Sequence, residues 1–323
     1  MKLFVTGGTG FFGKALLRRW AGSTDGELRH ARITLLSRDP ERFKAQHGAL
    51  LDGLDVTLHR GDILHPASLP TADDFTHILH AATDSTTGPQ HTPLQRFEQI
   101  AAGTRNVLEW ARGRGVRRVL LTSSGGVYGP QPADCERIPE QWLGMADPLE
   151  PQNAYSVAKR MAEHLCALYQ QAYGIECVIA RCFAFVGEDL PLDVHFAVGN
   201  FMRDVLAGGE IVIQGDGTPL RSYMDQRDLA DWLGTLLLRG VAGRAYNVGS
   251  DEALSIAELA ALVSRVGGKD TAVRVMRQAP SGSSAQRNRY VPDISRARAE
   301  LGLDITVPLE DAVRHALARI AGA

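Results

Sequence analysis

No apolar run in the sequence approaches the roughly 18 to 20 residues that a membrane-spanning helix requires. A secretion signal is also missing, because the opening MKLFVTGG reaches a glycine turn after a very short apolar stretch. These absences argue against an integral membrane protein and against export. We therefore expect a cytoplasmic protein that does not act at a membrane.

Neither sign of charge dominates the sequence. The 35 lysine and arginine residues are balanced by 37 aspartate and glutamate residues, which gives a formal net charge of -2. A chain without a basic excess gives no reason to expect nucleic acid or an anionic membrane surface as a partner. An anionic ligand would have to be bound by local groups.

Cysteine is scarce, and the four cysteines form no recognisable site. Cys135, Cys166, Cys177 and Cys182 show neither CxxC spacing nor a clustered histidine. That pattern argues against the usual zinc sites and against a disulfide framework. We expect no bound metal, and we interpret these residues as buried thiols.

Short apolar runs alternate with stretches of helical periodicity along the first half of the chain. Of the 323 residues, 44% are hydrophobic, which is enough for a packed core. Strands that alternate with helices indicate βαβ units and a parallel sheet covered by helices on both faces. We therefore predict an α/β fold with a doubly wound parallel sheet of the Rossmann type. The predicted strands are 3–6, 33–37, 77–82 and 118–124, and the predicted helices are 12–20, 94–112 and 155–172.

The sequence changes character after a further predicted strand in ECVIARCFAFVG (176–187). The turn-rich segments GEDLPLD, AGGE, QGDGTP and APSGSS then interrupt the alternation of strands and helices. We predict that a smaller region of mixed structure begins near residue 181.

A glycine-rich segment, TGGTGFFG, directly follows the first predicted strand and opens the first predicted helix. Glycines also mark ordinary turns, but a loop in this position can cradle a dinucleotide pyrophosphate. There Gly7 allows the tight turn, Gly10 lets the backbone approach the phosphates, and Gly13 lets the helix pack on the strand. The helix amino terminus adds free N–H groups and a positive dipole. The residues predicted to bind the cofactor here are Gly7, Gly10, Phe11, Phe12 and Gly13.

The segment GDIL (61–64) fits the loop after a third predicted strand. Asp62 could accept a hydrogen bond from an adenine amino group while Ile63 packs on the ring. The alternative is that Asp62 is a solvated turn residue.

Tyr155 and Lys159 are four residues apart on a predicted helix, so both side chains leave the same face. A phenol titrates near pH ~10, and a fixed ammonium would stabilise the phenolate and lower the pKa of Tyr155 toward a useful range for proton exchange. Such pairs are common on helix surfaces, and serines also end strands for turn reasons. Ser124 strengthens the interpretation, because it ends a strand at the edge where a parallel sheet places its ligands. We therefore predict Ser124, Tyr155 and Lys159 as the catalytic residues.

Together these motifs resemble the extended short-chain dehydrogenase/reductase family, which contains nucleotide-sugar epimerases, dehydratases, decarboxylases and ketoreductases. The resemblance implies an NAD(P) cofactor that exchanges hydride with a sugar ring carbon, a proton moved by Tyr155, and a nicotinamide ribose held by Lys159. It also adds Ala81 and Ala82 to the predicted cofactor-binding residues. It rests on TGGTGFFG, GDIL, HAAT, AAGTRNVLE, TSSGGVYG, YSVAK, RCFAFVG, GDGTPLRSY and RYVPDISRARAELGL.

The resemblance also implies how the chain is divided and assembled. Residues 1–180, with about 225–250, would form the NAD(P)-binding region. Residues of about 181–224 and 251–323 would form the region that binds a nucleotide-diphosphate sugar. A homodimer would pair the helices near 94–112 and 155–172 in a four-helix interface.

Basic residues of the second region are the candidates for holding the substrate. Arg221 in GDGTPLRSY matches the family's phosphate-binding arginine, and a guanidinium fork suits a diphosphate. Arg287 or Arg289 could add a second clamp, whereas Tyr290 could be a packing residue.

The chain departs from the family pattern at three positions. Ala184 stands where an asparagine is usual, so one polar contact to the substrate is missing. Gly125 and Gly126 stand just before VYG, where the dehydratases and decarboxylases carry an acidic residue. The leading hypothesis is therefore a 4-ketoreductase or C4 epimerase. The alternatives are a 4,6-dehydratase or decarboxylase, or a non-catalytic dinucleotide-sensing protein, although relatives of that last kind generally lack the Tyr and Lys pair.

The end of the second predicted strand bears on the choice of cofactor. NAD-preferring relatives carry an acidic residue there, which accepts from the adenosine ribose hydroxyls. This chain has Ser37 followed by Arg38, and both can bind a 2′-phosphate. We expect NADP(H) to be favoured over NAD(H). In the alternative, Arg38 is a solvated loop residue and Asp39 takes the carboxylate's place.

Overall fold

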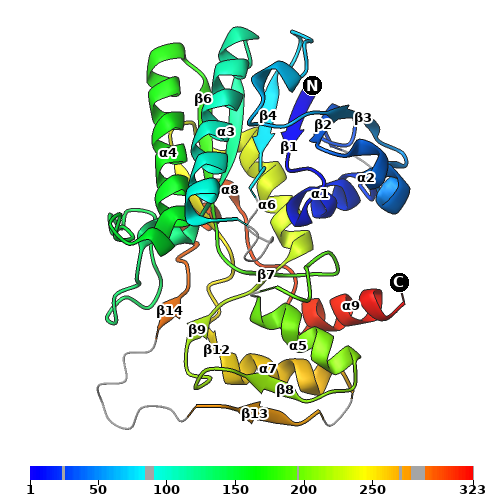
Figure 1. The fold of residues 1–323 in the computed structure, drawn as a ribbon, viewed down its shortest axis with the longest axis vertical. Coiled ribbons are helices and arrows are strands. Elements are labelled where there is room, and N and C mark those ends of the chain that lie inside the picture. Colours follow the sequence, from blue (N-terminus) through cyan, green and yellow to red (C-terminus); the bar gives the residue numbers. More distant parts are fainter. Residues whose placement is uncertain (24–25, 84–90, 195, 269–270, 278–287, 323) are drawn as a thin grey trace.

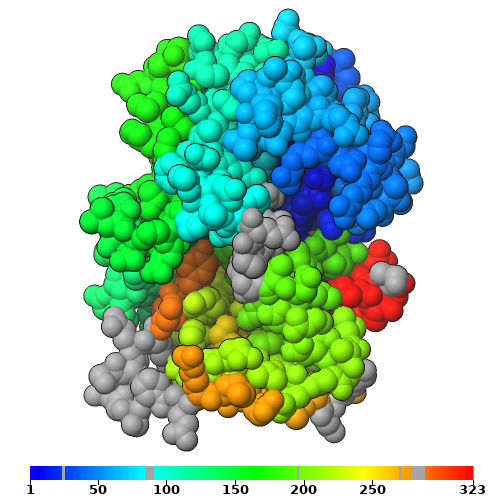
Figure 2. All heavy atoms as spheres, viewed as in Figure 1, coloured from blue at the N-terminus to red at the C-terminus, as the bar shows by residue number. Residues whose placement is uncertain are grey.

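The structure is a computed structural model that describes residues 1–23, 26–83, 91–194, 196–268, 271–277 and 288–322. A larger upper part contains a central sheet with helices on both of its faces, and a smaller lower part contains short helices and strands (Figure 1). In the space-filling view of Figure 2, dark blue atoms of the amino-terminal segment lie recessed between the two parts.

Parallel strands form the central sheet, seven of them in the described part of the chain. Their order is β11 (Ala245–Val248), β6 (Glu176–Cys182), β5 (Arg118–Ser124), β4 (His77–His80), β1 (Lys2–Thr6), β2 (Arg32–Ser37) and β3 (Asp55–Arg60). The chain begins at β1, moves outward to β3, and then returns to the other side of β1 at β4. This reversal opens a crevice at the carboxyl ends of the strands, where such sheets bind their ligands.

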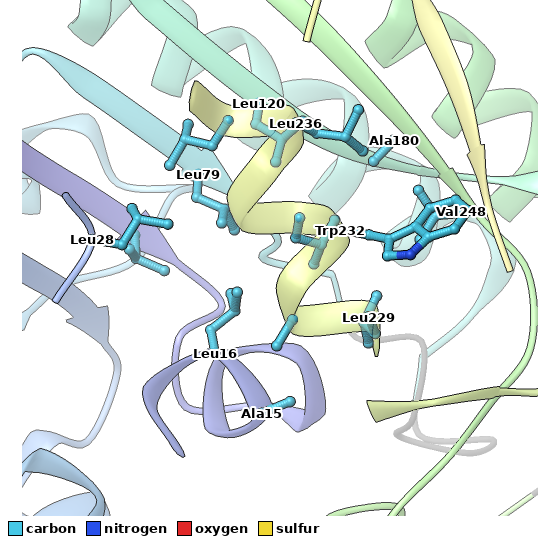
Figure 3. Close-up of a cluster of buried hydrophobic side chains, with 14 of the residues drawn as sticks. Ala15, Leu16, Leu28, Leu79, Leu120, Ala180, Leu229, Trp232, Leu236 and Val248 are labelled. Atoms are coloured by element: carbon cyan, nitrogen blue, oxygen red, sulfur yellow. The ribbon is translucent and has the colours of Figure 1, made fainter. Parts of the chain in front are cut away.

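Two helical layers cover the sheet, because successive side chains of a strand point to opposite faces. Leu3 and Val5 of β1 belong to a core shared with α1 (Phe11–Ala21) and α6 (Gln226–Arg239), whereas Phe4 belongs to the opposite core. Figure 3 shows the first of these cores, with Trp232 and Leu236 of α6 lying against the sheet.

The opposite core lies under α3 (Pro93–Gly113) and α4 (Ala154–Tyr173), which run side by side in Figure 1. Helix α3 starts with a capping box between Thr92 and Gln95. Helix α4 ends at Gly174, whose φ of 70° suits glycine at the end of a helix.

The lower part has a core of its own, formed mainly by α5 (Ala197–Leu206), α7 (Ile256–Val266) and α9 (Leu309–Ala321). Short strand pairs connect and flank these helices: β7 (Phe185–Val186) with β10 (Met224–Asp225), β8 (Ile211–Ile213) with β13 (Val273–Val275), and β9 (Leu220–Arg221) with both β12 (Leu254–Ser255) and β14 (Arg289–Tyr290). The remaining helices are α2 (Pro40–His47), α8 (Ser295–Leu301) and the short 3-10 turns Gly48–Leu51, Pro66–Ser68, Gly125–Tyr128 and Pro151–Asn153.

The predicted α/β class with a doubly wound parallel sheet is confirmed. The predicted strand over 176–187 is wrong in one respect, because β6 ends at Cys182 and β7 leaves the central sheet to pair with β10. The predicted strand over 77–82 ends early, at His80. We propose the predicted division into two regions with one change, since α8 contributes Ala297 to the core beneath α1 and α6.

Three further features concern membrane spans, metal clusters and thiols. Within the described ranges, none of the helices combines the length and the apolar character that crossing a bilayer requires. Among the same residues, no group of three or more His, Cys, Asp and Glu side chains is placed to hold a metal ion. All four cysteines are free thiols, but Cys135 is only half-buried, which corrects the expectation that all four are buried.

Gly13 permits the close approach of α1 to the glycine loop that follows β1. A β-carbon added at Gly13 would lie 2.1 Å from the backbone oxygen of Gly8, so the helix would have to shift. We expect Gly13→Ala to lower the free energy of unfolding by about 1–3 kcal/mol, as measured by urea denaturation. The control is Gly113→Ala in α3, where an added β-carbon has no neighbour within 4 Å. The control should leave stability unchanged or raise it by up to about 1 kcal/mol, and equal losses in both variants would contradict the packing role of Gly13.

Candidate active site

One cavity brings together most of the residues that the sequence analysis predicted for cofactor and substrate. It opens where β1, β4 and β5 end, and its volume is about 740 Å³, which is typical of ligand sites. The predicted residues that line it are Gly7, Gly10, Phe11, Phe12, Arg38, Asp62, Ile63, Ala81, Ala82, Ser124, Tyr155, Lys159 and Arg221. Of the other predicted residues, Gly13, Ser37 and Arg289 are not among the lining residues, and Arg287 lies outside the described residues.

The glycine loop at the end of β1 has the shape that a dinucleotide pyrophosphate needs. Gly7 has a φ of 73°, and a β-carbon there would lie 2.4 Å from the backbone of Ala81. Gly10 occupies the N-cap position of α1, and its N–H donates to the Gly7 carbonyl over 3.1 Å. The amino terminus of α1 therefore lies at the cavity with backbone N–H groups that no side chain caps. These residues fit an NAD(P) cofactor.

Residues at the end of β2 bear on the two alternatives for cofactor preference, which are Arg38 binding a 2′-phosphate and Asp39 binding the ribose hydroxyls. Arg38 lines the cavity, whereas the buried Ser37 hydroxyl accepts a hydrogen bond from the Asp39 N–H over 3.2 Å. The Asp39 carboxylate caps α2 by accepting from the Arg42 N–H, also over 3.2 Å. Asp39 is thus engaged at the start of a helix and is not among the residues that line the cavity.

Asp62 and Ile63 follow β3, as predicted, and both line the cavity. The Asp62 carboxylate also accepts from the Leu64 N–H over 2.9 Å, so it stabilises the turn as well as facing the cavity. The Ile63 carbonyl accepts from the Asn106 side chain over 2.8 Å, which fixes this loop against α3.

Ser124, Tyr155 and Lys159 meet in the cavity from two elements, the end of β5 and the first turns of α4. The Lys159 ammonium donates to the Thr83 hydroxyl over 2.7 Å and to the Thr122 carbonyl over 2.8 Å. It lies 5.9 Å from the centre of the Tyr155 ring. The arrangement places a phenol, a hydroxyl and an ammonium around one region of the cavity.

Burial sets the titration of the tyrosine and the lysine in this structure. Burial raises the pKa of Tyr155 to about 12, while a hydrogen bond with Ser124 acts in the opposite direction. Burial also lowers the pKa of Lys159 to about 8. The expectation of a lowered tyrosine pKa is therefore not met, because the loss of hydration dominates and the groups that oppose it are Ser124 and Arg96. Tyr155 is a neutral phenol at pH 7, which suits it to donate a proton.

The opposite wall of the cavity comes from the lower part. Strand β14 pairs with β9 so that Tyr290 lies beside Arg221, and both side chains line the cavity. The alternation along the strand sends Arg289 to the other face, where it donates to the Glu136 carbonyl over 3.2 Å. The structure thus brings Arg221 into the site but not Arg289. Burial lowers the pKa of Arg221 below its usual value, so an anion near it would be strongly favoured.

Neighbouring side chains fill the space beside Gly125 and Gly126. A β-carbon at Gly125 would lie 2.6 Å from the Tyr290 hydroxyl and 2.7 Å from the Phe183 ring. At Gly126 it would lie 2.7 Å from the Ser156 hydroxyl. An acidic side chain could not be placed at either position without moving these groups. Ala184, the third departure from the family pattern, lines the same cavity.

Several residues of the site were missed by the sequence analysis. Thr83 belongs to the HAAT motif and could have been suspected, but Thr122 acts through its carbonyl, which no side-chain pattern reveals. Arg96 and Gln99 of α3 line the cavity three residues apart, a spacing that is common on any helix. His80 is buried behind Lys159, and its ring nitrogens lie 2.6 Å from the Thr6 hydroxyl and 3.1 Å from the Thr104 hydroxyl. Burial lowers the pKa of His80 to about 3, so it is a neutral support of the site.

Comparison with known proteins agrees with this geometry. The family model of the NAD dependent epimerase/dehydratase family matches residues 3–249. UDP-glucuronic acid decarboxylase 3 of Arabidopsis thaliana is 28% identical over 317 residues, which are 96% of this chain and 86% of that relative.

Two solved structures superpose on nearly the whole chain. UDP-glucose 4-epimerase from Thermus thermophilus, in complex with NAD, has a TM-score of 0.82 and 25% identity and covers 100% of both chains. RMD from Pseudomonas aeruginosa, complexed with NADPH, has a TM-score of 0.79 and 25% identity and covers 99% of both chains. The sheet, the glycine loop and the match over residues 3–249 lead to one conclusion. The chain is a member of the NAD-dependent epimerase/dehydratase family of enzymes, as the resemblance of its motifs predicted.

Proposed function

We propose that this enzyme uses NAD(P) to oxidise or reduce a nucleotide-diphosphate sugar at ring carbon 4, as a 4-ketoreductase or a C4 epimerase. One observation carries the proposal: Ser124, Tyr155 and Lys159 share a single cavity with the glycine loop and Arg221. The similar proteins support it, since the decarboxylase and the UDP-glucose 4-epimerase are named for UDP sugars. The solved structures of the epimerase and of RMD contain NAD and NADPH.

The chain's own residues would handle the proton and the position of the sugar. Bound NAD(P) supplies or accepts the hydride. Tyr155, a neutral phenol, would donate its proton to the oxygen on carbon 4 during reduction and take it back during oxidation. Ser124 would hydrogen-bond the same oxygen, and Lys159 would hold the ribose hydroxyls of the cofactor. Arg221 would pair with the substrate diphosphate at the other side of the cavity.

Decarboxylation is a second candidate, favoured by the similarity to UDP-glucuronic acid decarboxylases. Against it stands the absence of an acidic side chain at Gly125 and Gly126, where Tyr290, Phe183 and Ser156 fill the space. A dehydratase would meet the same obstacle. A dinucleotide-sensing protein would bind cofactor without turnover.

A panel of nucleotide sugars distinguishes these functions. Purified protein would be incubated with UDP, dTDP, GDP and CDP sugars, native and 4-keto, while absorbance at 340 nm and product mass are followed. We expect reduction or epimerisation without loss of carbon dioxide or water. Loss of either molecule would favour the second candidate, and cofactor binding without any product would favour a sensor.

Tyr155→Phe tests the proton transfer directly. We expect turnover to fall by about 100-fold to 10,000-fold, because the variant removes the proton donor and keeps the ring. Cofactor affinity, measured by fluorescence titration, should stay nearly unchanged. Near-normal turnover in this variant would remove Tyr155 from the mechanism.

We further propose that NADP(H) is favoured over NAD(H). Arg38 lines the cavity beside the loop that follows β2, so its guanidinium can meet a 2′-phosphate. Asp39, the residue that would favour NAD(H), caps α2 instead. The known neighbours bind either cofactor, so the preference is a property of this chain's own residues.

The matching variant is Arg38→Ala. We expect it to raise the dissociation constant for NADP(H) at least about tenfold, or about 1.4 kcal/mol, and to change that for NAD(H) very little. Calorimetric titration of both cofactors measures the two constants. Equal losses for both, or a wild type that binds NAD(H) more tightly, would return Asp39 to consideration.

We also propose a homodimer formed through α3 and α4. These neighbouring helices expose large apolar side chains to solvent: Leu94 at 66%, Met161 at 39% and Leu168 at 45%. Met161 and Leu168 are seven residues apart, so they lie on one face of α4. A second copy of this helix pair would cover that face in a four-helix interface.

Paired substitutions at this face test the assembly. We expect Met161→Glu with Leu168→Glu to convert a dimer to a monomer in light scattering, because four buried carboxylates would face one another across the interface. Val241→Glu, at an exposed residue after α6, is the control and should leave the dimer intact. A wild type that is monomeric at every concentration would contradict the proposal.

A further inference from the structure

The cavity contains a cation to which the proposed function assigns no ligand group. Among the described residues that line it, the cations are Arg38, Arg96, Lys159 and Arg221, and the carboxylate is Asp62. Arg38, Lys159 and Arg221 already have proposed partners in the cofactor and the substrate diphosphate. Arg96 has none, so a further negative group is expected in the ligands.

Arg96 is built into the wall of the cavity. It lies in the first turns of α3, and Gln99 lines the cavity from the same helix face. The Arg96 Nε atom is buried and has no hydrogen-bond partner among the described residues. A buried cationic donor without an acceptor is costly, and a ligand oxygen would relieve that cost.

Two tyrosines of the cavity relate Arg96 to Arg221. Burial raises the pKa of Tyr155, and the positive charge of Arg96 opposes this effect. Burial likewise raises the pKa of Tyr290, and a hydrogen bond with Ser124 and the charge of Arg221 act in the opposite direction. Ser124 thus lies between the two tyrosines, Arg221 lies beside Tyr290 in the pairing of β9 with β14, and Arg96 lines the same cavity from α3. A sugar whose diphosphate meets Arg221 and whose reacting carbon meets Tyr155 turns its far side toward Arg96.

We propose that Arg96 binds a carboxylate on the sugar ring and so selects nucleotide uronic acids over neutral nucleotide hexoses. This inference rests on the proposed function, in which carbon 4 reacts at Tyr155. Carbon 5, the next ring atom, carries the carboxylate of a uronic acid, so that group lies beside the reacting carbon. The planar guanidinium matches a carboxylate with two parallel hydrogen bonds. A neutral hydroxymethyl group leaves the buried Nε atom of the half-buried Arg96 poorly satisfied, which penalises the neutral sugar.

The cofactor phosphates are a different kind of anion, and they belong to another part of the cavity. They are expected at the glycine loop and the amino terminus of α1, with Arg38 at the ribose phosphate. The experiment therefore measures cofactor affinity alongside sugar affinity.

The test compares UDP-glucuronic acid with UDP-glucose on the protein loaded with NADP(+). Calorimetric titration gives the dissociation constants, and product analysis gives kcat/KM, for wild type, Arg96→Gln and Arg96→Lys. Arg112→Gln, at an exposed residue of the same helix outside the cavity, is the matched control. We expect Arg96→Gln to weaken UDP-glucuronic acid about 20-fold, as for loss of a charge-assisted hydrogen bond, and UDP-glucose less than about twofold. Arg96→Lys should recover part of the loss.

Each outcome decides the proposal. Equal losses for both sugars, a loss confined to NADP(+), or a wild type that prefers UDP-glucose would overturn it. Selective binding of the uronic acid without turnover would support the role of Arg96 and overturn the proposed reaction instead. If Arg96→Gln does not fold, the ratio of the two affinities in Arg96→Lys decides, and an unchanged ratio overturns the proposal.

Discussion

The paired, buried ammonium of Lys159 holds the active site together. Its two hydrogen bonds join α4 to the loop after β4, through Thr83, and to the end of β5, through the Thr122 carbonyl. The Lys159 side chain is only 3% exposed, and an ammonium buried without hydrogen-bond acceptors would destabilise the fold by several kcal/mol. The two acceptors therefore make its burial possible. Once Lys159 is held, the pitch of α4 places Tyr155 one turn earlier, facing Ser124 at the end of β5. The geometry of the three proposed catalytic residues therefore follows from one pairing and one helical turn.

The parts of the site that are local in the sequence could be predicted. The glycine loop, the four-residue spacing of Tyr155 and Lys159, and the position of Ser124 depend on a strand, a turn and a helix that adjoin one another in the chain. Five strands and three helices of the upper part were predicted for the same reason, since their apolar periodicity is read residue by residue. The elements α2, β3, α6 and β11 were not assigned a range. The break between β6 and β7 was not, because the apolar run continues through it and only the partner strand changes.

Features that depend on pairing between segments far apart in the chain could not be predicted from the sequence. Arg221 was predicted from its motif, whereas Arg289 was proposed only as a basic residue that could add a second clamp. The register of β14 on β9 and the alternation along β14 send Arg289 away from the cavity. The role of Tyr290 was left open, with packing as one possibility, and the same register places it in the cavity wall. The pKa of Tyr155 was also misjudged, since the number of water molecules lost on burial cannot be read from the spacing of two residues.

The position of Tyr290 in the chain sets an order on how the site is assembled during synthesis. The central sheet is complete once β11 has emerged, and by then the glycine loop, Ser124, Tyr155 and Lys159 are all present. Strand β14 follows about 40 residues later. During synthesis, the residues proposed to bind the dinucleotide are therefore present well before Tyr290, which lines the proposed sugar site. The cofactor could therefore bind before synthesis ends, whereas the complete substrate site forms only after β14 has been made.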